Sequence, residues 1–235
     1  MNYGMSTTES AIYNKFVSYN YTGFLHMTDR DHAREILKSG FLGSREYEKG
    51  RDFGFQDNAN QSVIGITDEM IKQCARLYMY KGTPTYYNFE KDNPSNMVLF
   101  SFNWNVIKLD GAFITDGNPA CIPVTKVMPA SDFLNSDGSF LDYDRVFHRR
   151  PLPMIYKSVY EMNCEEYEMY EMRRDILRKR NAELDIPGTV PLLYLDKIIF
   201  KTQEDYDSFW SDERNKKLGH GYKFRSVVDG SYYCL

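Results

Sequence analysis

The pattern of apolar and polar positions predicts short strands and helices in an irregular order. Alternating or continuous apolar runs, typical of strands, occupy residues 23–27, 77–80, 96–102, 112–114, 183–186, 197–200 and 222–227. Apolar positions at helical spacing, or acids followed by bases, predict helices over residues 9–19, 29–39, 67–75, 165–180 and 203–214. These elements lack the regular strand–helix alternation of a doubly wound sheet, so we predict an α+β fold.

Several residues predict where elements begin and end. Thr28 or Asp29 can cap the helix that follows the first strand, and Thr28 with Asp31 resembles a capping box. Gly40 stands where a glycine should end that helix. Pro84 lies in a turn over residues 81–87, where it should prevent a helix.

Length and composition indicate one globular domain. The chain has 235 residues and is 42% hydrophobic, enough for a substantial core. We predict a single domain over residues 1–235, with residues 1–20 as an N-terminal extension and residues 129–164 as an irregular insertion. No run approaches the ~18 apolar residues of a membrane span, and the polar N-terminus lacks the apolar core of a signal peptide. We therefore expect no membrane association and a cytoplasmic location.

Charge and cysteine content exclude some classes of protein. The formal net charge of −4 excludes a uniformly basic nucleic-acid binder, although a local basic patch remains compatible with it. The four cysteines are far apart and form no CxxC motif, and the four histidines form no metal-binding pattern. We expect neither a structural zinc site nor a disulfide framework, and no metal cofactor.

Two stretches contain candidate chemistry. Alternation places Glu183 and Asp185 on one side of a predicted strand, next to a basic run that ends at Arg180. A fixed carboxylate there could stabilise a developing cation, or it could be a solvated strand residue. His26 and Thr28 share one side of the first strand, where His26 could equally be a core histidine and Thr28 only a helix cap.

Four fragments in this chain resemble DarT-type ADP-ribosyltransferases, toxins that modify bases of single-stranded DNA. They are His26-Met27-Thr28, the aromatic strand and threonine–proline turn of residues 76–86, Phe113–Asn118, and the block Arg180–Pro187. Together they span roughly residues 23–200 in the family's order. The resemblance implies an ADP-ribosyltransferase fold, a split β-sandwich of two small sheets with flanking helices and a cleft for NAD+.

The resemblance also implies roles for individual residues. Glu183 would be the catalytic carboxylate, helped by His26 and by a cation for which Arg76 is the candidate. The side chains or backbone that would bind NAD+ are those of His26, Met27, Thr28, Gly40, Phe41, Leu42, Asn60 and Tyr78. No metal is needed for this chemistry.

The implied acceptor is a base of single-stranded DNA, or of RNA, in a toxin–antitoxin or antiphage system with a protein antitoxin. The residues that would bind the nucleic acid, by stacking or phosphate contacts, are Tyr86, Tyr87, Arg178, Lys179 and Arg180. Residues 58–66 lack the paired arginines of DNA-modifying members, which leaves open the identity of the cationic helper and of the acceptor. Residues 148–164 do not align with those members. Two alternatives remain, a protein-modifying ADP-ribosyltransferase and a non-enzymatic α+β nucleic-acid-binding module.

Overall fold

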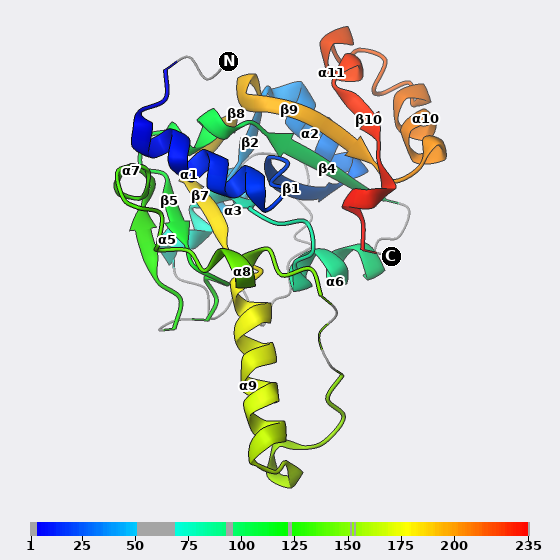
Figure 1. Cartoon of the computed structure of the whole chain (residues 1–235). Coiled ribbons are helices and arrows are strands. Elements are labelled where there is room, and N and C mark those ends of the chain that lie inside the picture. The colour runs from blue at the N-terminus through cyan, green and yellow to red at the C-terminus, as the bar shows by residue number, and fades with distance from the viewer. Residues whose placement is uncertain are drawn as a thin grey trace.

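The computed structural model of the chain describes residues 4–50, 69–92, 96–121, 124–150, 152 and 154–234. In these residues one eight-stranded sheet and one two-stranded sheet are surrounded by helices (Figure 1). The strands are β1 (Phe24–Asp29), β2 (Phe41–Gly43), β3 (Cys74–Tyr78), β4 (Met97–Phe102), β5 (Phe113–Thr115), β6 (Val127–Pro129), β7 (Glu183–Pro187), β8 (Thr189–Pro191), β9 (Leu195–Phe200) and β10 (Ser226–Val228). The α-helices are α1 (Thr7–Ser18), α2 (Arg30–Ser39), α3 (Arg45–Lys49), α5 (Glu69–Lys72), α6 (Pro84–Asp92), α7 (Ala130–Leu134), α8 (Tyr143–Val146), α9 (Cys164–Lys179), α10 (Gln203–Ser211) and α11 (His220–Phe224).

The eight-stranded sheet consists of two halves that share a single residue pair. Its strand order is β10-β9-β4-β1-β3-β7-β5-β6, and the central β1–β3 pairing is limited to Leu25 opposite Tyr78. Strands β9 and β10 are parallel, whereas the other neighbours in this sheet are antiparallel. The predicted α+β class is confirmed. The two small sheets that the resemblance implies correspond to the two halves on either side of the β1–β3 junction.

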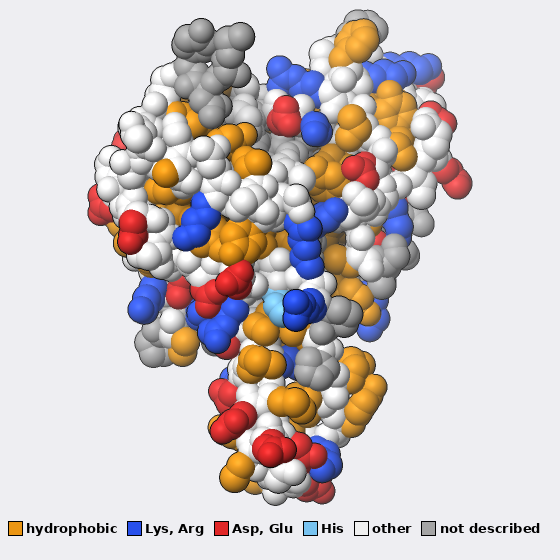
Figure 2. Space-filling model, viewed as in Figure 1, with side chains coloured by type: hydrophobic (Ala, Val, Ile, Leu, Met, Phe, Trp, Pro, Cys, Tyr) orange, Lys and Arg blue, Asp and Glu red, His pale blue; other side chains and the backbone are white. Residues whose placement is uncertain are grey.

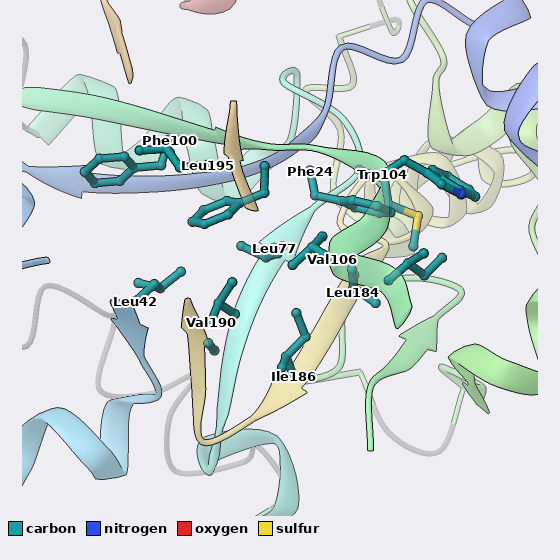
Figure 3. Close-up of a cluster of buried hydrophobic side chains, with 14 of the residues drawn as sticks. Phe24, Leu42, Leu77, Phe100, Trp104, Val106, Leu184, Ile186, Val190 and Leu195 are labelled. Carbon is teal, nitrogen blue, oxygen red and sulfur yellow. The ribbon is translucent and has the colours of Figure 1, made fainter. Parts of the chain in front are cut away.

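The main hydrophobic core packs against one face of both halves of the sheet (Figure 3). Alternation places Phe24 of β1, Leu77 of β3 and Leu184 of β7 in this core, and all three are fully buried. Burying a side chain of this size stabilises a fold by about 1.5–3 kcal/mol relative to leaving it exposed. The intervening residues, Arg76 and Glu183 among them, therefore point to the opposite face of the sheet.

The predicted N-terminal extension and the predicted irregular insertion both contribute side chains to this core. Residues 1–20, predicted as an N-terminal extension, contain α1, which buries Phe16 there. Residues 129–164, predicted as an irregular insertion, contain α7 and α8, which bury Phe133 and Tyr143 in the same core. Helices of four or five residues are too short to show a helical period, so the apolar pattern did not reveal them.

Two predicted boundaries are wrong on either side of β3. The helix expected over residues 67–75 ends after the four residues of α5, and Ala75 already lies in β3. Pro84, expected to prevent a helix, is the first residue of α6. Proline is tolerated there because the first N–H groups of a helix have no intrahelical acceptor. The Thr83 hydroxyl caps the helix by accepting from the Tyr86 N–H at 3.0 Å.

Helix α2 ends before Gly40, as the sequence predicted. It begins at Arg30, one residue later than a capping box with Thr28 as the N-cap requires. The Asp29 carboxylate, and not Thr28, caps α2 by accepting from the His32 N–H at 2.8 Å. Gly40 ends α2 with φ of 80°, in the left-handed region, and its N–H donates to the Ile36 carbonyl. Glycine adopts this conformation without the steric cost that a side chain brings.

Helix α9 extends away from the rest of the molecule together with the segment before it (Figure 1). We refer to residues 154–175 as the arm. Within α9 only Ile176 is buried, and the arm exposes 86% of Tyr156 and 99% of Tyr160. Asn163 and Glu166 form a capping box at the start of the helix. None of the described helices, α9 included, is both long and apolar enough to cross a membrane.

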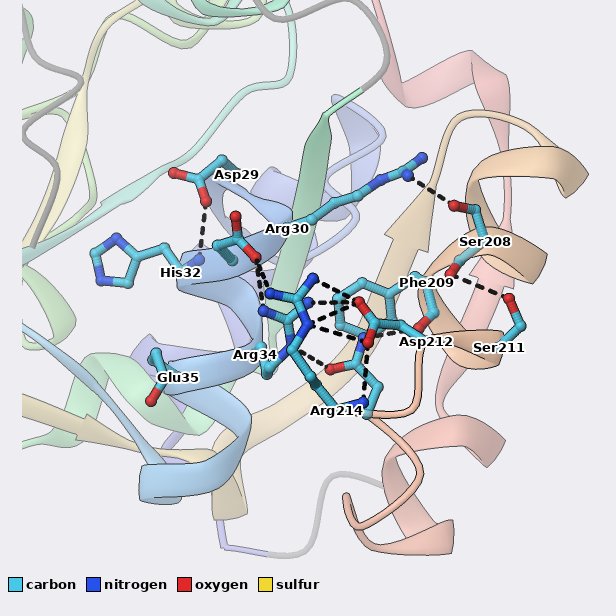
Figure 4. A network of polar contacts seen from close by, with 12 residues as sticks. Asp29, Arg30, His32, Arg34, Glu35, Ser208, Phe209, Ser211, Asp212 and Arg214 are labelled. Carbon is cyan, nitrogen blue, oxygen red and sulfur yellow. Dashed lines mark hydrogen bonds and ion pairs between the residues drawn. The ribbon is translucent and has the colours of Figure 1, made fainter. Parts of the chain in front are cut away.

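A buried arginine connects α2 to the turn after α10 (Figure 4). The Arg34 Nε donates to Asn215 Oδ1 at 2.6 Å, and its two Nη atoms pair with Asp31 at 2.6 Å and Asp212 at 3.1 Å. Asn215 is 1% exposed and donates in turn to the Phe209 carbonyl at 2.7 Å. This network holds α10 against the helix that continues from β1.

Replacing this arginine should weaken the fold measurably. In Arg34→Ala the buried side-chain oxygen of Asn215 loses its hydrogen-bond donor. Asp31 and Asp212, whose side chains are 73% and 24% exposed, can instead form hydrogen bonds with water. We expect the free energy of unfolding, measured in urea, to fall by about 1–3 kcal/mol. The control Arg214→Ala removes a 64% exposed side chain that also pairs with Asp212, and should cost about 0–1 kcal/mol. Equal losses in the two variants would contradict the proposed role of Arg34.

Candidate active site

A bidentate ion pair joins β3 to β7 next to the junction of the two sheet halves. The Arg76 Nε lies 2.6 Å from Glu183 Oε2, and its Nη2 lies 2.7 Å from Oε1. The Glu183 side chain is 1% exposed and that of Arg76 is 32% exposed, so the acid lies inside and part of the cation reaches solvent. Glu183 is therefore not a solvated strand residue, and its burial depends on this partner because an unpaired buried charge is costly.

The register of the strands places the charged groups on one face. Leu184 belongs to the main core, so Glu183 and Asp185 point to the opposite side of β7. Across the β3–β7 pairing, Tyr78 lies opposite Glu183 and Arg76 lies opposite Asp185. The two acids thus share one side of the strand, as the sequence predicted.

His26 contacts the backbone of Arg76 from the other half of the sheet. Its Nδ1 lies 3.2 Å from the backbone carbonyl oxygen of Arg76 and donates to it in the tautomer that is protonated at Nδ1. Burial lowers the pKa of His26 to about 4, although the hydrogen bond to this carbonyl opposes the shift. The imidazole is therefore neutral near pH 7, and its Nε2 remains an acceptor. Arg76 thus connects the imidazole to the carboxylate of Glu183.

Burial also shifts the titration of the neighbouring groups. It raises the pKa of Glu183 above its ordinary value, and the Arg76 guanidinium opposes the rise. It raises the pKa of Tyr78, and the charge of Glu183 acts in the same direction. For Arg76, burial lowers the pKa, but the charge of Glu183, the hydrogen bond to it and the charges of Tyr78 and Asp185 together raise the pKa more, so the guanidinium stays protonated. Converging groups with shifted pKa values are typical of functional sites.

The turn after β5 anchors the end of α9 just before β7. Asp116 pairs with Arg178 at 3.1 Å, and the Asn118 N–H donates to the Arg178 carbonyl at 2.9 Å. A Cβ atom on Gly117 would lie 3.1 Å from that carbonyl oxygen, closer than side chains normally allow. Asp116, Gly117 and Asn118 therefore all lie against Arg178, in the last turn of α9.

The beginning of β7 is held from two further directions. The Glu183 N–H donates to the Thr115 hydroxyl at 3.1 Å. Asn181, two residues earlier, accepts from the Thr85 hydroxyl at 3.1 Å, which connects it to the first turn of α6. The family-like fragments at residues 76–86 and 113–118 thus lie beside the fragment that contains Glu183.

The other residues predicted to bind NAD+ lie on β1, β2 or β3 or at their ends, with one exception. They are Met27, Thr28, Gly40, Phe41, Leu42 and Tyr78. Strand β2 pairs with β8, which brings Phe41 and Leu42 beside the chain that continues from β7. Asn60 is the exception because it lies outside the described residues. Contact with NAD+ stays a prediction for each of these positions.

The basic residues at the end of α9 have partners within the chain. Arg178 and Lys179 form ion pairs with Asp116 and Asp142, both at 3.1 Å, and these partners offset their charge. Arg180 instead donates to backbone carbonyls, that of His148 at 2.6 Å among them. Of the three, Arg180 is thus the best placed to attract a phosphate.

The two tyrosines predicted to stack on a base differ in accessibility. Tyr86 is 0% exposed and packs in a second core cluster with Leu99 and Tyr232, whereas Tyr87 is 45% exposed. A base cannot stack on a ring that is fully buried, so the stacking prediction does not suit Tyr86. The stacking prediction therefore applies to Tyr87, the next residue of α6.

Two exposed arginines that the sequence analysis did not single out lie beside Arg180. Its Nη2 lies 3.2 Å from the carbonyl oxygen of Arg150, and the adjacent Arg149 donates to the Tyr19 carbonyl at 2.7 Å. Basic side chains lie where the arm meets the body, with acidic side chains beside some of them (Figure 2). The arginine pair is visible in the sequence, but a separation of 30 residues hides its proximity to Arg180.

The outer part of the arm has the opposite character. Residues 158–172 contain five acids and no lysine or arginine. This stretch repels a polyanion, which limits a nucleic-acid surface on this side to the base of the arm.

Two cavities lie apart from the ion pair. One of about 540 Å³ is lined mainly by residues 107–113 and by α7, and one of about 240 Å³ borders the Arg34 network. Neither lining includes Glu183 or His26. The larger of the two has a mostly apolar lining, whereas the paired charges lie at the junction of the sheet halves. Among the described residues, no three His, Cys, Asp or Glu side chains are grouped to hold a metal ion.

Comparisons with known proteins show which family the chain belongs to. The family model described as "DarT: ssDNA thymidine ADP-ribosyltransferase, DarT" matches residues 25–223, and no curated protein matches. Thermus sp. 2.9 DarT with ADP-ribosylated ssDNA has 12% identity and a TM-score of 0.64 over 90% of this chain and 95% of its own. Its complex with NAD+ has 12% identity and a TM-score of 0.60, over 90% and 96%.

A further structure, Thermosipho africanus DarTG in complex with ADP-ribose, has 16% identity and a TM-score of 0.63. The match covers 92% of this chain but about half, 52%, of that one. These likenesses confirm the ADP-ribosyltransferase fold. Because the family model covers most of its length, the chain belongs to the DarT family of ssDNA thymidine ADP-ribosyltransferases.

Proposed function

We propose that this chain transfers ADP-ribose from NAD+ to a base of single-stranded DNA, as the toxin of a toxin–antitoxin or antiphage system. The observation that carries the proposal is the buried Glu183 paired with Arg76, with His26 against the same residue, in a chain of the DarT family. The complex of Thermus sp. 2.9 DarT with ADP-ribosylated ssDNA favours DNA over RNA as the acceptor here.

The chemistry requires a carboxylate in this position. Breaking the nicotinamide–ribose bond develops positive charge on the ribose, as in glycoside hydrolysis. The Glu183 carboxylate stabilises that charge where it develops, and nicotinamide leaves. A base nitrogen then bonds to the ribose carbon, and the same carboxylate accepts the proton that this nitrogen loses.

The neighbouring residues bind and orient the dinucleotide. The neutral His26 offers Nε2 as an acceptor to a ribose hydroxyl, and the exposed part of Arg76 faces the pyrophosphate or the leaving group. We assign the remaining contacts with NAD+ to the ends of β1 and β2 and to Tyr78.

The nucleic acid is bound at the base of the arm. Arg149, Arg150 and Arg180 supply positive charge there, and the exposed Tyr87 offers a stacking surface. A toxin of this kind also needs a neutralising partner, for which we propose a protein antitoxin.

Loss of the carboxylate should abolish transfer. Glu183→Gln keeps the shape of the side chain but cannot stabilise the ribose cation, so we expect activity to fall at least on the order of 10³-fold. The measurement is mass spectrometry of nucleosides from short DNA and RNA oligonucleotides treated with NAD+. The control Glu213→Gln makes the same change on an 80% exposed side chain and should leave activity unchanged.

Several outcomes of this experiment would contradict the proposal. Full activity in a folded Glu183→Gln protein excludes the assigned role of that residue. Modification of RNA alone, or of added protein alone, selects a different acceptor. Absence of both NAD+ binding and modification in the wild-type protein favours the non-enzymatic binding module.

The imidazole of His26 should titrate far below its ordinary range. The pKa of His26 is about 4 in the fold, and its ordinary value is 6.5. The contribution of the neutral ring to the free energy of unfolding is therefore complete above pH 6.5. That contribution is lost as the pH falls from 6.5 toward 4. An NMR titration, with the resonance assigned through His26→Gln, should give a midpoint near 4. A midpoint of 6 or higher would show that the ring is solvated.

The arginines at the base of the arm should determine affinity for DNA. In Arg149→Ala/Arg150→Ala we expect weaker binding of a labelled single-stranded oligonucleotide, and a salt dependence reduced by about 0.7 in slope per lost phosphate contact. The control Lys216→Ala/Lys217→Ala removes the same charge beyond α10. Equal weakening in both variants would indicate a general charge effect and not a local site.

A further inference from the structure

Asp185 is a buried acid that the proposed reaction leaves unused. Its side chain is 0% exposed, and neither of its oxygens has a hydrogen-bond partner in the described part of the chain. Buried polar groups in folded proteins are nearly always hydrogen-bonded. An acid that is buried without a hydrogen-bond partner, two residues from Glu183, therefore requires an explanation.

The strand register gives Arg76 two carboxylates within reach. Asp185 lies directly opposite Arg76, whereas Glu183 is the diagonal neighbour. Directly opposite side chains are the closer ones in an antiparallel pair. The guanidinium nevertheless bonds to Glu183 at 2.6 and 2.7 Å, and its Nε lies 3.9 Å from Asp185 Oδ1. A small shift of the Arg76 side chain would bring it to the acid that it faces.

The observed pairing is unfavourable for the reaction. Both oxygens of Glu183 accept from Arg76, so most of its charge is offset before a ribose cation forms. Stabilising that cation requires an oxygen of Glu183 that faces the ribose. If Arg76 withdrew without a new partner, its charge would be left uncompensated in a largely buried position.

We propose that Asp185 is a positioning residue that takes Arg76 from Glu183 when the nicotinamide end of NAD+ enters the site. This inference rests on the proposed function. Before binding, Glu183 is ionised, Arg76 is protonated and Asp185 holds a proton, so the three groups sum to zero. The cationic nicotinamide adds one positive charge. Asp185 then releases its proton to solvent, and the four groups again sum to zero.

The surroundings of Asp185 are consistent with a protonated acid in the free protein. Burial raises its pKa well above the ordinary value, the charge of Glu183 adds to the rise, and Arg76 opposes it. The titratable side chains that face it from β3 are Cys74, Arg76 and Tyr78, and β5 presents the apolar Phe113 opposite it. Of these groups, Arg76 alone carries a positive charge.

The test counts protons and separates turnover from binding. Carba-NAD+, whose nicotinamide–ribose bond is not cleaved, is titrated into the protein at pH 6 in two buffers of different ionisation enthalpy. We expect the wild type to release about one proton per bound molecule and Asp185→Asn to release none. With NAD+ and DNA, Asp185→Asn should lower kcat on the order of 10- to 100-fold, with KM for NAD+ nearly unchanged.

The control is Glu90→Gln, which changes another fully buried carboxylate. Glu90 pairs with Lys201, the residue directly after β9. It should keep both the proton release and the kcat of the wild type. Wild-type proton release and kcat in Asp185→Asn would overturn the inference while leaving the proposed function intact.

A second measurement does not depend on NAD+. In Glu183→Gln, Arg76 loses its anionic partner, and a crystal structure should show its guanidinium within about 3.2 Å of Asp185. A guanidinium that stays away from Asp185 in this variant would overturn the inference. This structure also decides the matter if Asp185→Asn does not fold.

Discussion

The pairing of Arg76 with Glu183 is the interaction on which the rest of the site depends. An acid buried on β7 needs a cation, and β3 supplies one only in a register that places both side chains on the same face. That register is stable because the other face of both strands, with Leu77 and Leu184, belongs to the main core. The hydrophobic pattern and the chemistry of the site are therefore two consequences of the same strand alternation.

The sequence predicted the parts of this arrangement that depend on local pattern. The strand at Glu183 and the charged helix before it follow from alternation and from the order of acids and bases. What it missed depends on proximity between distant residues or on very short elements. Helices α7 and α8 are too short for a period, and the nearness of Arg150 to Arg180 requires the fold. Pro84 was misread because its position within the helix, and not its identity, decides its effect.

The distribution of charge explains how an acidic chain can bind a polyanion. The net charge of −4 is a sum over the whole chain, which includes an acidic arm and a basic region at its base. Arg178 and Lys179, basic by sequence, are neutralised by aspartates and serve to anchor α9. Arg180 with Arg149 and Arg150 then remains as the local positive surface next to β7, and the field near the site matters more than the total charge.

We propose that Glu183 and His26 bind opposite parts of one nicotinamide riboside at the junction of the sheet halves. A crystal structure of the chain with carba-NAD+ tests it most directly. We expect a carboxylate oxygen of Glu183 within about 3–3.5 Å of the ribose carbon that bears the nicotinamide, and His26 Nε2 within hydrogen-bond distance of a ribose hydroxyl. A dinucleotide bound away from both residues, for instance in the cavity lined by residues 107–113, would contradict it.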